Sequence, residues 1–134
     1  MTDDFDPIDI ATTVFGFARS GDAARLAAYL DAGVPTDLTN ESGDTLVMLA
    51  AYHGHADTVA VLTERGADVN RLNDRGQSPL AGAVFKGHDA VVRSLVDAGA
   101  DADLGTPSAR ATARMFGQNR YLEWFGPDPS DSPS

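Results

Sequence analysis

The chain contains no cysteine, no long apolar run and little positive charge. Without cysteine it can form no disulfide, no thiolate nucleophile and no Cys-ligated zinc site. No apolar run reaches about 18 residues, so the sequence predicts no membrane-spanning helix. Its 10 basic residues stand against 20 acidic ones, a net charge of −10, and the only lysine is Lys86. Because nucleic acids and anionic membranes both attract basic surfaces, we expect neither as a partner.

The remaining composition is that of one ordinary globular unit. The chain has 134 residues, of which 43% are hydrophobic and 22% charged. This length suits one hydrophobic core or one short stack of repeats, but not two independent domains. The first six residues hold three carboxylates, where a secretory signal needs positive charge. We therefore expect a soluble, monomeric, cytoplasmic protein.

Glycines recur along the chain with a period of 33 residues. Residues 41–73 and 74–106 share nine identical positions when they are aligned at this period. A weaker unit precedes them, and a fourth, three residues shorter in its approach, ends near Gly117. Such a period is typical of a solenoid of stacked repeats. The recurring glycines are Gly21, Gly54 and Gly87, then Gly33, Gly66 and Gly99, then Gly43 and Gly76.

Each unit predicts two short helices followed by an extended loop. In the second unit, residues 47–51 form the first expected helix, which Gly54 ends. Residues 57–65 form the second expected helix, with Val59 and Leu62 on one face and Gly66 at its end. Helices this short cannot bury an apolar face alone, so we expect neighbouring units to stack into a continuous core.

Two of the units resemble the ankyrin repeat. The family pattern is Gly-x-Thr-Pro-Leu-His-x-Ala-Ala-x-x-Gly-His, a second helix and then Gly-Ala-Asp-Val-Asn. Met48 and Ala81 stand where the family has the His of Thr-Pro-Leu-His. The matching stretches are residues 43–55 with Gly66-Ala67-Asp68-Val69-Asn70, and residues 76–80 with Gly87-His88 and Gly99-Ala100-Asp101.

The resemblance implies an all-α ankyrin-repeat solenoid of helix-turn-helix units with protruding loop fingers. Its repeats cover about residues 8–39, 40–72, 73–105 and 106–125, and the first and last act as caps. Residues 1–7 are expected to form a disordered acidic tail. Residues 126–134, rich in Pro and Ser, are expected to form a second disordered tail.

No motif predicts catalysis, a cofactor or a metal site. His53 and His55 make a tempting metal pair, but His55 and His88 occupy the Gly-His position of the repeat, whose role in the family is structural. His53 aligns with Lys86, so the repeat does not require a ligand there. Phosphate-binding loops, nucleophile elbows and complete calcium loops are all missing from the sequence.

Protein binding is the function that the resemblance implies. In the family, the fingers and the exposed side of the first helices form a concave surface that binds other proteins. Packing of these large side chains on neighbouring repeats is the alternative. Carried onto this chain, the finger positions include Thr39, Glu41, Ser42, Asp44, Leu72, Asp74, Arg75 and Gln77, and the first-helix positions include Tyr52, His53, Phe85, Lys86, Met115 and Phe116.

We therefore predict a noncatalytic protein-interaction module. The acidic balance favours a partner with a basic patch, although the same charge would also keep a free protein in solution. The alternative function is an accessory or inhibitor subunit that regulates a partner enzyme by covering its site.

Overall fold

The computed structural model describes residues 7–129, which form four consecutive pairs of helices. This confirms the predicted all-α solenoid. Most of the two predicted tails, residues 1–6 and 130–134, lies outside the described residues. The helices are α1 (Pro7–Ser20), α2 (Ala23–Asp31), α3 (Leu46–Tyr52), α4 (Ala56–Glu64), α5 (Pro79–Lys86), α6 (Asp89–Asp97), α7 (Ala109–Met115) and α8 (Asn119–Phe125).

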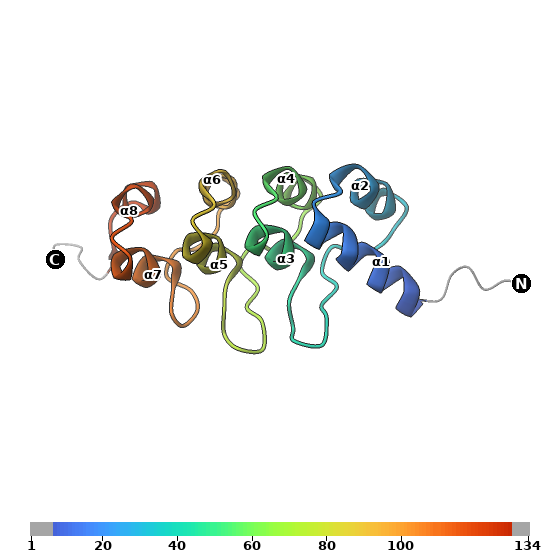
Figure 1. Cartoon of the computed structure of the whole chain (residues 1–134), viewed down its shortest axis with the longest axis horizontal. Coiled ribbons are helices and arrows are strands. Elements are labelled where there is room, and N and C mark those ends of the chain that lie inside the picture. Colours follow the sequence, from blue (N-terminus) through green and yellow to red (C-terminus); the bar gives the residue numbers. More distant parts are fainter. Residues whose placement is uncertain (1–6, 130–134) are drawn as a thin grey trace, which may run out of the picture.

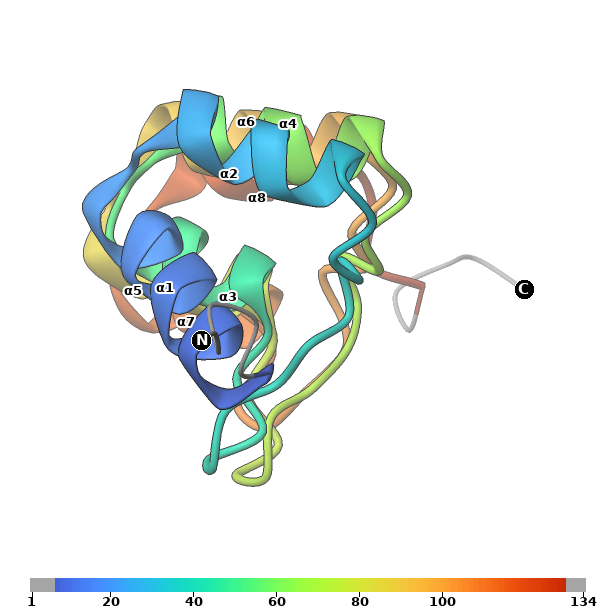
Figure 2. The ribbon, with the colours of Figure 1, turned by 90° about the vertical axis from the view of Figure 1, so that its right-hand side faces the viewer.

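The helices form two parallel rows (Figures 1 and 2). The inner row contains α1, α3, α5 and α7, and the outer row contains α2, α4, α6 and α8. Between successive pairs the chain leaves the helices as long loops that project on the side of the inner row. We call these loops the first finger (residues 39–45), the second finger (residues 72–78) and the shorter third finger (residues 104–107).

Hydroxyl side chains start the inner helices. The Thr45 hydroxyl accepts a hydrogen bond from the Met48 N–H at 3.1 Å, and the Ser78 hydroxyl accepts one from the Ala81 N–H at 3.0 Å. Ser108 caps α7 in the same way. The helix starts are therefore satisfied although Met48 and Ala81 replace the histidine of the family pattern.

One core runs through the whole stack. Its side chains come from both rows, and each repeat supplies about the same positions, because helices of seven to nine residues bury only one face. Val59 and Leu62 are buried as the sequence predicts. The largest fully buried side chains are Tyr121, Leu26, Leu46, Leu62, Leu80, Leu95, Val14, Val47, Val59, Val84, Val91 and Val92.

Each repeat also binds a carbonyl group at the end of the preceding inner helix. His55 Nε2 lies 2.8 Å from the Arg19 carbonyl oxygen, and His88 Nε2 lies 3.1 Å from that of Tyr52. In the fourth repeat Gln118 Nε2 donates to the Val84 carbonyl at 3.0 Å. The predicted structural role of the two histidines is thus a bridge between repeats, and Gln118 takes that role where the sequence has no histidine.

Replacing His88 with Ala should destabilise the fold modestly. The Tyr52 carbonyl would lose its partner, which costs about 0.5–1.5 kcal/mol in the free energy of unfolding. His88→Gln should recover most of the loss, because Gln118 makes the equivalent bond in the next repeat. Urea denaturation of the three proteins measures the difference. Equal losses in both variants would instead assign the effect to packing of the His88 ring over Gly54.

The last repeat is closed by residues beyond its second helix. The buried Arg110 side chain pairs with Asp103 at 2.8 Å and donates to the Gly126 carbonyl at 2.8 Å. Asp128 pairs with Arg114, also at 2.8 Å. Residues 126–128, assigned by composition to the tail, are therefore held against α7. At the other end, Pro7 is already the first residue of α1.

Tyr121 should ionise only in strong alkali. Burial first, and then the hydrogen bond that its hydroxyl donates to the Asp89 carboxylate, raises the pKa of Tyr121 to about 12. Because the unfolded chain ionises at about pH 10, the neutral phenol stabilises the fold fully below that pH. This contribution is lost as the pH rises through about 12. In an alkaline titration followed by ultraviolet difference absorption, Tyr121→Phe should abolish the last tyrosinate step, and persistence of that step would contradict the assignment.

Candidate functional site

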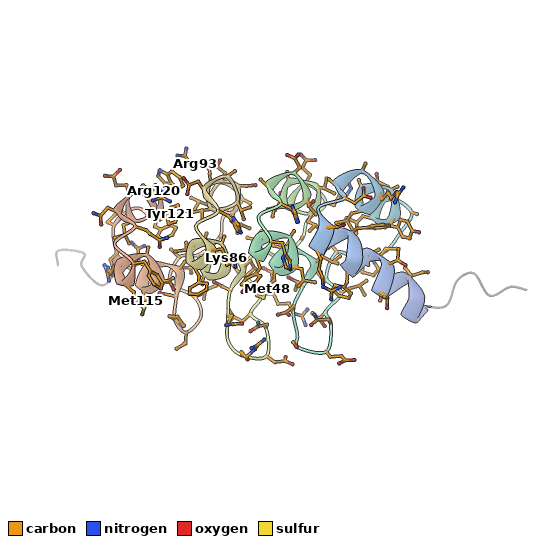
Figure 3. The ribbon with its side chains drawn as sticks, viewed as in Figure 1. Met48, Lys86, Arg93, Met115, Arg120 and Tyr121 are labelled. Atoms are coloured by element: carbon orange, nitrogen blue, oxygen red, sulfur yellow. The ribbon has the colours of Figure 1, made fainter. Side chains whose placement is uncertain are left out.

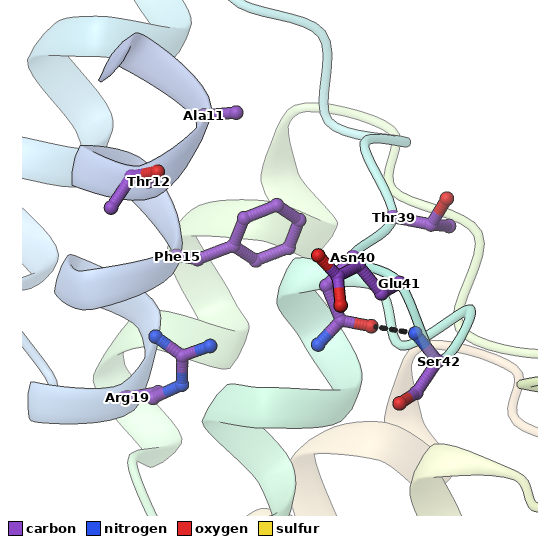
Figure 4. A pocket seen from close by; sticks show the side chains of 8 residues that line it. All are labelled: Ala11, Thr12, Phe15, Arg19, Thr39, Asn40, Glu41 and Ser42. Carbon is purple, nitrogen blue, oxygen red and sulfur yellow. Dashed lines mark hydrogen bonds between the residues drawn. The ribbon is translucent and has the colours of Figure 1, made fainter. Parts of the chain in front are cut away.

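A groove runs along the stack between the inner row and the fingers. It consists of three hollows that follow one another from repeat to repeat. The first, of about 730 Å³, lies between α1 and the first finger (Figure 4). Phe15 forms its apolar side, and Arg19 and Glu41 belong to its opposite walls. The other hollows, of about 330 and 320 Å³, share Met48, Tyr52 and Gln77, so they adjoin each other.

One asparagine organises each of the two longer fingers. The Asn40 side-chain oxygen accepts hydrogen bonds from the Ser42 N–H at 2.9 Å and the Asp44 N–H at 3.0 Å. Asn73, which lies 33 residues later, accepts from Arg75 and Gln77, both at 3.0 Å. These bonds fold each finger on itself without a regular strand.

The fingers are also bonded to one another. The Asp74 N–H donates to the Ser42 carbonyl, and the Thr106 N–H donates to the Gly76 carbonyl, each at 3.0 Å. A Cβ on Gly43 would lie 2.9 Å from the Asp74 backbone nitrogen, and Gly43 has a φ of +77°. Only glycine fits there, both sterically and conformationally. The fingers therefore form one laced wall of the groove.

The inner row presents large apolar side chains to solvent at the ends of its helices. We call Tyr52, Phe85, Met115 and Phe116 the apolar strip. Their exposed fractions are 42%, 59%, 70% and 53%. The Phe85 and Phe116 rings meet edge to face with centroids 5.8 Å apart. Figure 3 shows Met115 on the inner row, on the opposite side of the stack from the outer-row residue Arg93.

Positive groups stand beside this strip. The Lys86 ammonium lies 5.1 Å from the centre of the Tyr52 ring, and the His53 ring meets Tyr52 edge to face at 5.5 Å. Burial, the largest cause, lowers the pKa of His53 below its ordinary value. Nearby positive charges lower this pKa further, in the order His55, Arg19, Lys86 and His88.

The predicted finger residues divide into two groups. Glu41, Asp74 and Arg75 are exposed, and Leu72 is 38% exposed. Asp44 and Gln77 instead belong to the hydrogen bonding of the fingers. Both accept from the Asn73 amide, at 2.9 and 2.8 Å. Asp44, Arg75 and Gln77 line the second hollow, whereas Glu41 lines the first.

Several groove residues were not among the predicted site residues. Phe15 and Met48 are buried in the floor, and Pro107 and Thr112 line the third hollow. Met48 carried a signal, because it replaces the histidine of the family pattern. The other three occupy no recurring position that the sequence comparison marked, and their approach depends on the packing of different repeats.

The described part of the chain offers no assembled metal site. Across residues 7–129, no group of three or more His, Asp or Glu side chains could hold an ion. Within the same span, no helix is long and apolar enough to cross a membrane.

Comparisons with known proteins all point in one direction. A family model for ankyrin repeats in three copies matches residues 15–106. A Pseudomonas aeruginosa protein named for ankyrin repeats is 43% identical over 53 residues, which are 40% of this chain and 31% of that protein. The crystal structure of the human ASB11 ankyrin repeat domain superposes with a TM-score of 0.74 at 27% identity. That superposition covers 84% of this chain and 52% of the human domain, so this chain spans well under two thirds of both relatives.

Proposed function

The chain belongs to the ankyrin repeat family, and from this premise we propose that it binds a partner protein, without catalysis, in the groove between its inner row and its fingers. Ankyrin repeats generally act as protein–protein interaction modules. The inner row supplies apolar side chains and the laced fingers supply a polar wall. These are the two components from which protein interfaces are built.

The observation that carries the proposal is the exposure of the apolar strip. Six large apolar side chains in the described residues are at least 37% exposed, and four of them form this strip. Side chains that served only to close the stack would be covered by the neighbouring repeat. Phe85 and Met115 instead keep 59% and 70% of their surface open. Aromatic and Met side chains gathered at one place are typical of the centre of a binding surface.

Affinity capture from a lysate of the source organism tests the proposal. The bait is the full chain, compared with Tyr52→Ala/Phe85→Ala and with Tyr29→Ala as a matched control. Tyr29 is also exposed, at 37%, but lies on α2 in the outer row. We expect proteins that the wild type and the Tyr29 variant both retain and the double variant loses. If the same proteins remain on all three baits, the groove is not the binding site.

The same material tests for a regulatory role. If a captured partner is an enzyme, its activity is measured with and without the added chain. A change in activity would assign the chain to the accessory or inhibitor class, and unchanged activity would assign it to tethering.

A further inference from the structure

Resting on the proposed function, we infer that the groove receives a carboxylate-rich protein segment, which is seated by a row of positive groups on the inner row. We call Arg19, His53 and Lys86 the cationic ridge. Arg19 lies in the last turn of α1, His53 caps the end of α3, and Lys86 lies in the last turn of α5. The ridge thus takes one residue from each of three successive repeats.

The ridge is a connected feature of the stack. His55 bonds to the Arg19 carbonyl, and the His53 and His55 rings stack with centroids 6.4 Å apart. Lys86 lies over the Tyr52 ring, which belongs to the apolar strip. Positive charge and exposed apolar surface therefore adjoin along the same helix ends.

Two ridge cations have no carboxylate partner. Of the ten basic residues, five form ion pairs with Asp side chains at 2.7–3.6 Å: Arg25, Arg65, Arg110, Arg114 and Arg120. Among residues 7–129, neither Arg19 nor Lys86 forms an ion pair, although the chain holds 20 acidic residues. In an acidic protein, cations left without partners at one place favour a partner that brings its own carboxylates.

The surroundings of His53 agree with this charge preference. The charges that perturb it come from α1, from α5 and from the turns that follow α3 and α5, and all of them are positive: Arg19, Lys86, His55 and His88. The second finger adds Arg75 to the same hollow. The one carboxylate that lines this hollow is Asp44, which is already bonded to Asn40 and Asn73. A carboxylate docked here would relieve repulsion among like charges.

Helix electrostatics alone do not account for this arrangement. A positive charge in the last turn of a helix complements its dipole, and this favours Arg19 and Lys86 where they are. It does not explain why all three histidines gather with them. The fingertips, in contrast, expose Glu41 and Asp74. This polarity would hold a bound segment's carboxylates toward the ridge and leave its apolar side chains to the apolar strip.

Selection from a displayed random-peptide library on the purified full chain tests the inference. We expect the enriched peptides to combine Asp or Glu with aromatic or aliphatic residues. Arg19→Gln/Lys86→Gln should weaken their binding roughly tenfold, since two exposed ion pairs are lost. Arg25→Gln/Arg71→Gln removes the same charge outside the ridge and should leave binding nearly unchanged. Thermal melting of both variants should match the wild type.

The pH dependence of the same peptides provides a second measurement. A bound carboxylate favours protonated His53, so the affinity should rise as the pH falls from about 7.5 to about 5.5. His53→Gln should flatten this rise, with His55 and His88 still present in both proteins. An affinity that is independent of pH in the wild type would count against His53 as part of the ridge.

The outcomes separate the two proposals. Enrichment of Lys- and Arg-rich peptides that still require Tyr52 and Phe85 would overturn the acidic partner and keep the binding groove. Acidic peptides that bind the Arg19/Lys86 variant as well as the wild type would also overturn the ridge. An empty selection, or peptides that do not require Tyr52 and Phe85, would count against both proposals.

Discussion

Replacing Tyr52 and Phe85 together with Ala is expected to weaken partner binding about a thousandfold while the chain remains folded. Aromatic anchors at the centre of an interface contribute ~2 kcal/mol or more each when they are truncated, and each ~1.4 kcal/mol is a factor of ten. Both rings keep about half of their surface in solvent, so their removal opens little of the core. Isothermal titration calorimetry with the captured partner measures the loss, and thermal melting checks the fold.

Substitutions on the fingers serve as the comparison. Glu41→Gln with Asp74→Asn changes two exposed carboxylates and leaves Asp44, which Asn73 needs as an acceptor, in place. With an acidic partner these substitutions should speed association slightly, whereas a basic partner would associate more slowly. A double Ala variant with unchanged affinity, or with a large fall in melting temperature, would assign Tyr52 and Phe85 to packing.

Deleting residues 108–134 should abolish cooperative folding. The deletion removes α7 and α8, which cover α5 and α6, and so exposes Val84, Val91, Val92 and Leu95, all fully buried in the intact chain. Exposing an aliphatic side chain of this size costs about 1.5–3 kcal/mol, and the sum approaches the ~5–15 kcal/mol that stabilises a whole domain. Size-exclusion chromatography should show aggregation, and circular dichroism should show a lost or broadened melting transition.

Deleting only residues 127–134 is the matched truncation. It removes the Asp128 partner of Arg114, an exposed ion pair worth roughly 0–1 kcal/mol, and keeps the Gly126 carbonyl that Arg110 requires. The melting temperature should therefore change little. Similar behaviour of the two truncations would mean that the fourth repeat does not seal the stack.

The sequence predicts the repeats well because their physics is local. Each helix pair is marked by a glycine stop, a hydroxyl cap and apolar residues on one face, and the 33-residue period repeats these marks. The period fails only at the fourth repeat, where the spacing falls to 30 residues. For this reason, the bridge made by Gln118 could be found only when its contact with Val84 was seen.

The groove was harder to predict because its walls come from residues in different repeats. Asp44 has the composition of a free fingertip acid, yet a partner 29 residues away, Asn73, fixes its carboxylate. The cationic ridge was hidden for a related reason. Net charge counts every residue equally, whereas the structure pairs most arginines on the outer row and the last repeat with Asp and leaves Arg19 and Lys86 unpaired.

The side-by-side stacking of the inner helices turns the groove into a measuring device. Packed helices lie about 8–10 Å apart, and the apolar strip draws its members from α3, α5, α7 and the residue after α7. An extended polypeptide advances about 3.3 Å per residue. A segment lying along the stack would therefore meet one repeat at roughly every third residue, and its sequence would be read in steps of three rather than residue by residue.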